Sequence, residues 1–168
     1  MKIEDLPEPA HRNTANFRAN SAERYSKVAR VFAESIRRNS PVDLEGSNCP
    51  VLVEGKRDEE ALRDMGFRGI IEQFNRGWDQ SRVIAYLYDT YGSKNPIDSG
   101  PPVIVLMDWD RTGGRLQSTI RKRLESLDVK IDESLWYSLM RSMKPEGRTV
   151  EALRAHADVL SPLIQDNM

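Results

Sequence analysis

The chain has 168 residues, which is enough for one main domain with a substantial hydrophobic core. Its 25 Lys and Arg residues and 26 Asp and Glu residues give a formal net charge of -1, so no overall field attracts nucleic acid and any polyanion site must be local. A single cysteine, Cys49, excludes an internal disulfide and a cysteine-cluster zinc site.

The beginning of the chain predicts an arm followed by a helix. Residues 1–15 lack apolar periodicity, so we expect a loosely ordered arm there. Apolar side chains then recur every three or four residues over residues 25–36, which predicts an amphipathic helix that Ser21 caps. No apolar run approaches the roughly 20 residues of a membrane-spanning helix, and we expect a cytoplasmic protein without membrane contact.

A segment rich in Pro, Gly, Asn and Ser over residues 39–50 indicates a boundary in the chain. We therefore expect an N-terminal arm and amphipathic helix over residues 1–49, and a second part over residues 50–168 that holds the remaining elements. The amphipathic helix is a candidate contact for a protein partner.

From Pro50 onward, short apolar strands alternate with helices. The predicted strands are VLVEG, GIIEQF and VIVLM, and the predicted helices are RDEEALRDMG, SRVIAYLYDTYG with Asp79 as its cap, and RLQSTIRKRLESL. Strands that are apolar throughout predict a parallel sheet covered by helices on both faces, which is an α/β fold. The rest of the chain reads as helices, with Asp132 and Thr149 as caps.

Two aspartates follow the third predicted strand directly. Side chains alternate along a strand, so Asp108 and Asp110 should project to one side while Trp109 points away. Two carboxylates this close repel each other unless a proton or a cation lies between them. Oxygen ligands suit a hard divalent ion such as Mg²⁺ or Mn²⁺, which is the simplest explanation of the pair.

The ends of the first and third strands carry acidic motifs in a fixed order. The first is Glu-Gly with an aspartate four residues after the glutamate, and the second is Asp-x-Asp-x-x-Gly: Glu54, Gly55 and Asp58, then Asp108, Asp110 and Gly113. Over residues 50–127 this pair of motifs resembles the Toprim family. The resemblance is to the short stand-alone type, similar to the bacterial ribonuclease that matures 5S ribosomal RNA and to small uncharacterised archaeal Toprim proteins.

The resemblance implies a Toprim-like (Rossmann-like) parallel sheet flanked by helices, with the N-terminal helix as an extension. It implies that Asp108 and Asp110 bind Mg²⁺ or Mn²⁺, and that Glu54 acts as a general acid or base or as a further metal ligand in phosphodiester chemistry. Gly55 and Gly113 would serve tight strand-to-helix turns. Asp58 either favours the positive end of its helix or positions a metal or a water molecule.

Basic residues surround these strand ends. We expect Lys56, Arg111 and Arg115 to bind phosphate groups, with Arg57 and Arg76 nearby. The basic run of residues 121–123 is read as a solvated helix face. Trp78 and Trp109 either stack on unpaired bases or pack in the core.

These patterns predict a magnesium-dependent nuclease that acts on structured RNA or DNA. One alternative is a catalytically silent module that binds nucleic acid or a nucleotide. A second is a subunit that docks a partner in a nucleic-acid-processing complex through the helix of residues 25–38. The intact set of Glu54, Asp108 and Asp110 favours the enzyme, and the near-neutral net charge favours a module that borrows affinity from a partner.

Overall fold

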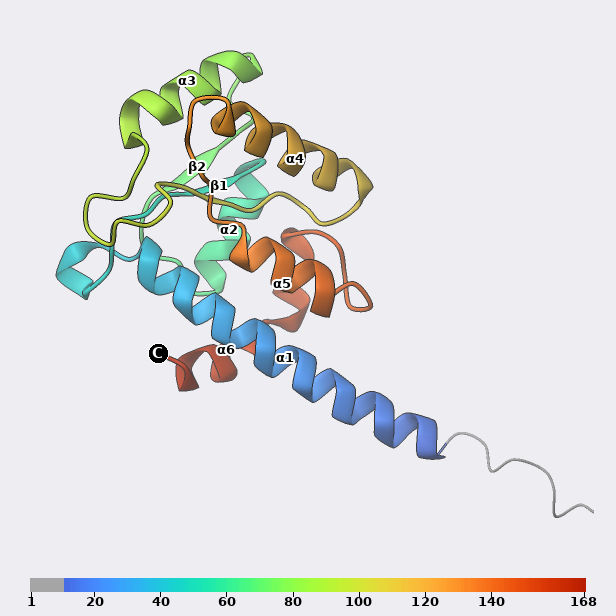
Figure 1. Ribbon diagram of the computed structural model, residues 1–168. Coiled ribbons are helices and arrows are strands. Elements are labelled where there is room, and N and C mark those ends of the chain that lie inside the picture. Colours follow the sequence, from blue (N-terminus) through green and yellow to red (C-terminus); the bar gives the residue numbers. More distant parts are fainter. Residues whose placement is uncertain (1–10) are drawn as a thin grey trace, which may run out of the picture.

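The computed structural model describes residues 11–168, and side chains are described from Asn20 onward. The first element is the long helix α1, His11–Asn39, and the short 3₁₀ helix η2, Val42–Leu44, follows it (Figure 1). The predicted arm was wrong over residues 11–15, and Ser21 is not a cap, because the helix begins ten residues earlier. No glycine or proline interrupts this stretch, and its alanine and arginine residues favour helix. The rest of the predicted arm lies outside the described residues.

A parallel sheet forms the centre of the fold. Its strands are β1, Val51–Val53, β2, Ile71–Gln73, and β3, Ile104–Val105, in the order β2-β1-β3. Val51 pairs with Ile71 on one side and with Ile104 on the other. The predicted parallel sheet is confirmed, although the strands are shorter than their apolar runs. The chain leaves the sheet after Leu106, whose amide still donates to the Leu52 carbonyl at 2.9 Å, so Asp108 and Asp110 lie beyond the sheet.

Six further helical elements follow the strands. They are α2, Lys56–Asp64, α3, Gln80–Tyr91, α4, Arg111–Glu125, α5, Ser134–Ser142, the 3₁₀ helix η3, Glu151–His156, and α6, Ala157–Asp166. Asp79 caps α3 as predicted, since its Oδ1 accepts a hydrogen bond of 2.8 Å from the Arg82 amide. Thr149 Oγ1 accepts from the Ala152 amide at 3.1 Å, but the N-cap residue of η3 is Val150, so the cap was predicted one residue too early.

The two faces of the sheet lie in separate hydrophobic layers. Val51, Val53 and Leu106 belong to the layer packed by α1, α2, α5 and α6. Leu52 and Val105 belong to the layer packed by α3 and α4. Figure 1 shows α3 and α4 above the sheet and α1, α5 and α6 below it. Helices therefore cover both faces, as a Rossmann-like α/β arrangement requires.

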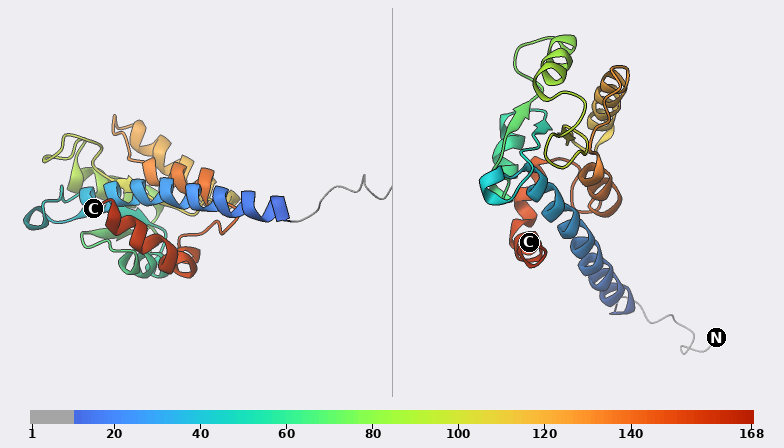
Figure 2. Two further views of the ribbon diagram at one scale, coloured as in Figure 1. Left: turned by 90° about the horizontal axis from the view of Figure 1, so that it is seen from below. Right: turned by 60° about the vertical axis from the view of Figure 1, so that its left-hand side comes forward.

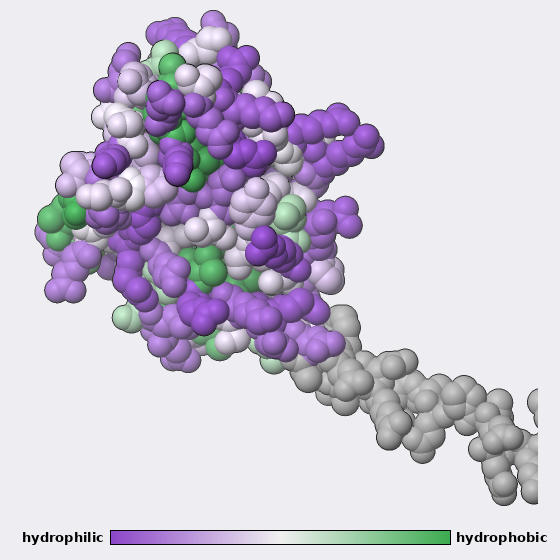
Figure 3. All heavy atoms as spheres, viewed as in Figure 1, coloured by the Kyte–Doolittle hydropathy of each residue, from purple (hydrophilic) through white to green (hydrophobic). Residues whose placement is uncertain are grey.

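Helix α1 is part of the hydrophobic core. Val28, Ala29 and Phe32 are completely buried, and the helix packs against α5 and α6 (Figure 2). The apolar face of the helix that was predicted to dock a partner is therefore covered by the chain itself. Figure 3 shows that the face seen in Figure 1 is mainly hydrophilic. Within residues 11–168, none of the helices combines the length and the apolar character needed to cross a bilayer.

Gln117 is completely buried and joins α4 to the end of β3. Its Oε1 accepts from the Met107 amide at 3.0 Å, and its Nε2 donates to the Val105 carbonyl at 3.1 Å. Nε2 also donates to Glu133 at 3.2 Å. The side chain thus satisfies backbone groups at the point where the chain leaves the sheet for the two aspartates.

We expect Gln117→Leu to lower the free energy of unfolding by about 2 kcal/mol, because it leaves a buried amide and a buried carbonyl without partners. Thr119→Ala, on the same helix, is the control and should change it by less than about 0.5 kcal/mol. Urea denaturation measures both. An unchanged midpoint for Gln117→Leu would contradict the assigned role.

Candidate functional site

Acidic side chains gather where β1 and β3 end. Glu54 follows β1 directly, and Asp58 lies in the first turn of α2. Asp108 lies three residues beyond β3, and Asp110 is the N-cap of α4. All four side chains are half-buried. We call Glu54, Asp58, Asp108 and Asp110 the carboxylate cluster.

Two members of the carboxylate cluster stabilise helix beginnings. Asp110 Oδ1 accepts a hydrogen bond of 2.7 Å from the Gly113 amide, and Asp58 Oδ2 accepts one of 3.0 Å from the Gly55 amide. These contacts satisfy amides that have no partner within the helix. Asp108 and Asp110 both lie outside β3, so the predicted alternation of side chains along a strand does not determine which way they point.

Asp108 is the most perturbed member of the cluster. Burial raises the pKa of its carboxyl, the hydrogen bond from the Val150 amide opposes this, and the negative charges of Asp58, Asp110 and Glu54 add to the rise, so that the pKa is about 6. That amide donates to Asp108 Oδ1 at 2.8 Å. The tertiary structure thus brings the predicted acidic residues into one electrostatically coupled group.

Asp58 has a second acidic neighbour that sequence reasoning missed. Burial raises the pKa of Asp58, the Gly55 amide lowers it, and the negative charge of Glu151 raises it. Glu151 begins the 3₁₀ helix η3 near the C-terminus, and no motif marks it. Among the described residues, no cationic side chain forms an ion pair with Glu54, Asp58, Asp108 or Asp110.

The predicted metal ligands do not form a ready-made cage. Within the described part of the chain, no group of three or more His, Cys, Asp or Glu side chains is arranged to hold a metal ion. Glu54, Asp108 and Asp110 are therefore neighbours without being a preformed three-ligand site. Any cation would need ligands from elsewhere, such as water or phosphate oxygens.

A basic cavity opens beside Asp110. It has a volume of about 760 Å³, and its cationic lining residues are Arg111, Arg115, Lys122, Lys144 and Arg148. Asp110 is the one carboxylate in this lining. We call it the basic cavity. Arg111 and Arg115, two of the residues predicted to bind phosphate, line it beside Asp110, whereas Lys56 lies outside it at the start of α2.

The basic cavity contains cations that the sequence did not single out. Lys144 and Arg148 belong to the segment between α5 and η3, far from the strand-end motifs. This segment is held against the site by Trp109, whose amide donates to the Arg148 carbonyl at 2.8 Å. The indole Nε1 of Trp109 donates to the Gly147 carbonyl at 2.7 Å. Trp109 is buried and packs in the core, so it is not available for base stacking.

The other basic residues near the strand ends have different surroundings. Arg76 forms an ion pair with Glu72 at 3.5 Å and lies over the rings of Trp78 and Tyr86. Arg57 is exposed at the beginning of α2 and lies outside the basic cavity. In the basic run, Arg121 pairs with Glu133 and Arg123 donates to Ser81, so Lys122 alone lines the cavity.

The chain is similar in sequence to UPF0292 proteins. The chain is 32% identical over 111 residues to the UPF0292 protein TV1259 of Thermoplasma volcanium, covering 66% of this chain and 84% of that protein. It is 29% identical over 128 residues to a UPF0292 protein of Thermococcus onnurineus, covering 73% of this chain and 86% of that protein. A UPF0292 protein of Thermococcus gammatolerans is 30% identical over 129 residues, with 77% and 85% covered. No protein-family model matches the chain.

A solved structure of a protein from Aquifex aeolicus has a similar fold. Its TM-score is 0.50 with 23% sequence identity, and the match covers 71% of this chain and 93% of that one. None of these proteins is named as a Toprim protein, so the Toprim identification made from the motifs was wrong. Its residues have a more general explanation, because Asp58 and Asp110 bond to the amides of Gly55 and Gly113 as helix-capping residues do after a strand.

Proposed function

The chain belongs to the UPF0292 family, whose name specifies no activity. From the geometry of the site, we propose that the chain cleaves phosphodiester bonds in nucleic acid with the help of a divalent cation. The observation that carries the proposal is the juxtaposition of two oppositely charged features. The carboxylate cluster has no described cationic partner, and the basic cavity begins at one of its members, Asp110. A substrate phosphate in the cavity would lie beside carboxylates that need a cation between them.

The donor set fits a hard divalent ion. Asp108 and Asp110 each use one carboxylate oxygen for an amide, and no described donor bonds to the other oxygen. Mg²⁺ is commonly bound by one or two carboxylates together with phosphate oxygens and water, so a three-carboxylate cage is not required. When bound, such an ion would supply charge neutralisation at the phosphate and a more acidic water molecule.

Residues of the chain itself would bind the phosphate groups and accept the proton. Arg111 and Arg115 lie on exposed positions of α4 in the basic cavity, where their guanidinium groups can hold phosphate oxygens. Glu54 is the one member of the carboxylate cluster without a hydrogen bond to a described donor, so it is the best placed to accept a proton from water. Asp58 holds the beginning of α2 in position through Gly55.

A module that binds nucleic acid or a nucleotide without cleaving it is the second candidate. The hydrogen bonds that Asp58 and Asp110 accept at the beginnings of α2 and α4 favour it, because they give these carboxylates a structural role. Both candidates require the basic cavity to bind phosphate. They differ in whether the carboxylate cluster supports a chemical step.

The test is incubation of the full chain with radiolabelled structured RNAs and DNAs, in Mg²⁺, in Mn²⁺ and in chelator. We expect cleavage in either metal and none in chelator. Arg111→Gln with Arg115→Gln should weaken binding and reduce the slope of log affinity against log salt, because two phosphate contacts are lost. The expected reduction is about 1.4 on single strands and about 1.8 on duplexes, at about 0.7 and about 0.9 for each contact.

The matched control is Lys94→Gln with Lys130→Gln, two exposed cations that line a different cavity. It removes the same charge and should leave the salt slope unchanged. Intact substrates in every metal, with binding still dependent on Arg111 and Arg115, would replace the cleavage proposal with the silent module. Equal effects of the two double variants would sink both candidates.

A further inference from the structure

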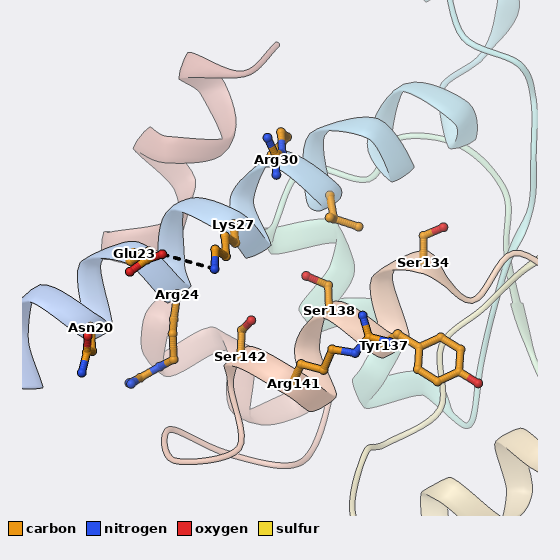
Figure 4. A pocket seen from close by; sticks show the side chains of 11 residues that line it. Asn20, Glu23, Arg24, Lys27, Arg30, Ser134, Tyr137, Ser138, Arg141 and Ser142 are labelled. Carbon is orange, nitrogen blue, oxygen red and sulfur yellow. Dashed lines mark ion pairs between the residues drawn. The ribbon is translucent and has the colours of Figure 1, made fainter.

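A second cavity lies between α1 and α5, on the other flank of α5. Its volume is about 850 Å³, and Lys27 and Arg30 of α1 line it together with Arg141 of α5. Figure 4 shows Lys27 extending from α1 toward α5, while Ser138 and Ser142 point back toward α1. We call this cavity the α1–α5 groove.

The lining also contains Arg24, which is paired with Glu146, and one carboxylate, Glu23. The other three cations, Lys27, Arg30 and Arg141, form few bonds to other groups. Lys27 pairs with Glu23 at 3.2 Å, but both side chains are more than 60% exposed, and such pairs contribute little. Among the described residues, no carboxylate forms an ion pair with Arg30 or Arg141. Arg141 lies over the ring of Tyr137, with 5.5 Å between its guanidinium carbon and the ring centroid. The groove therefore offers positive charge and hydroxyl donors to an anion.

Helix α5 is the wall between the groove and the basic cavity. Trp136 and Met140 face the basic cavity, whereas Ser138 and Arg141 face the groove. Lys144, two residues past the end of α5, lines the basic cavity as well. A chain of phosphates leaving the basic cavity across α5 would thus meet a second set of cations. Because the formal net charge of the chain is -1, the positive charge that gathers in the basic cavity and the α1–α5 groove is a local property and not a property of the whole surface.

We infer that the α1–α5 groove binds the phosphodiester backbone of the same nucleic acid strand, several nucleotides away from the phosphate held beside the carboxylate cluster. The inference rests on the proposed function for the identity of the ligand. Lys27, Arg30 and Arg141 neutralise phosphates, and Ser138 and Ser142 donate hydrogen bonds to phosphate oxygens. Substrates long enough to cross α5 consequently bind more tightly than short ones.

The experiment measures binding in chelator, so that its result does not depend on cleavage. Fluorescence anisotropy follows single-stranded RNA and DNA of about 16 nucleotides and of about 4 nucleotides, spanning the site sizes of single-strand binding proteins. The variant is Lys27→Gln, Arg30→Gln, Arg141→Gln. We expect the salt slope for the long oligonucleotides to fall by about 2, at about 0.7 for each of three lost contacts, and that for the short ones to stay unchanged.

The control is Arg68→Gln, Lys94→Gln, Lys130→Gln, which removes three exposed cations that line neither the groove nor the basic cavity. An unchanged slope for the long oligonucleotides, or an equal effect of the control, would overturn the inference. The inference would also be overturned if the chain bound a Glu-rich peptide and neither oligonucleotide, and if this binding were lost in the Lys27, Arg30, Arg141 variant. If the triple variant lowers the salt slope but the chain cleaves no substrate, the groove still binds nucleic acid and the proposed cleavage activity is wrong.

Discussion

Asp108→Asn is expected to lower cleavage by at least about 100-fold while making the folded chain more stable at pH 8. The amide keeps the shape of the side chain and can still accept from the Val150 amide, so the local backbone contact survives. It removes the charge that would draw a cation to the site. It also removes the repulsion that Asp58, Asp110 and Glu54 exert on Asp108.

The stability gain has a defined pH window. Burial and the neighbouring charges raise the pKa of Asp108 to about 6 in the folded chain, above the value of about 3.9 expected when unfolded. The protonated form is the one that folding favours, so this contribution is fully present below pH ~4 and is lost as the pH rises through about 6. Because the side chain is half-buried and solvent screens it, we expect a gain of about 1 kcal/mol for Asp108→Asn above that range.

Urea denaturation in chelator at pH 4 and pH 8, with cleavage assays at pH 8, measures both effects. Asp43→Asn, an exposed aspartate in η2, should change neither quantity. Full cleavage by Asp108→Asn would remove Asp108 from the proposed site. A lower free energy of unfolding at pH 8 would show instead that its charge is stabilised by partners in the folded chain.

Gly113→Ala is expected to destabilise the chain by about 3 kcal/mol or more and to disturb the carboxylate cluster. A Cβ at this position would lie 2.2 Å from the Asp108 carbonyl oxygen and 2.7 Å from the Asp108 Cβ. These are backbone and proximal atoms, so relief requires α4 to move away from segment 106–110. The Gly113 amide that bonds to Asp110 would move with it.

The neighbouring glycine provides the matched control. A Cβ at Gly114 would have the Trp136 Cζ2 as its nearest neighbour at 3.8 Å, which is ordinary van der Waals contact. Since alanine favours helix over glycine, Gly114→Ala should stabilise the chain by about 0.5–1 kcal/mol. Thermal and urea unfolding of the two variants should therefore move in opposite directions. Movement in the same direction would contradict the close approach of Gly113 to Asp108.

The elements after Pro50 were predictable because each has a local signal. Unbroken apolar runs marked β1 and β3, and Asp79 marked the beginning of α3 through the hydrogen bond that it accepts. Strand lengths were less predictable, because the apolar run 103–107 continues past β3 into a buried segment held by Gln117. The beginning of α1 was missed because the apolar periodicity from which the helix was predicted starts only at Tyr25.

The acidic residues of the candidate site were also visible in the sequence, yet their family assignment failed. Glu54 and the two aspartates stand out because they follow apolar strands, which is where parallel sheets place ligands. The same pattern arises when aspartates cap the helices that follow, as Asp58 and Asp110 do. A short motif shared by capping and by chemistry therefore does not identify a family.

Periodicity and capping are properties of neighbouring residues, so the α/β class, the parallel sheet and the positions of the acidic strand ends can be read from the amino-acid sequence. Which charged groups meet depends instead on how distant segments of the chain pack together. Val150 and Glu151 approach the aspartates, and Lys144 and Arg148 complete the basic cavity, because Trp109 anchors a segment remote in sequence. Helix α1 likewise forms a groove with α5 through packing of its buried face. The burial of the acidic groups and the approach of segments distant in the chain determine the electrostatic interactions at the site, and no local sequence pattern encodes either of them.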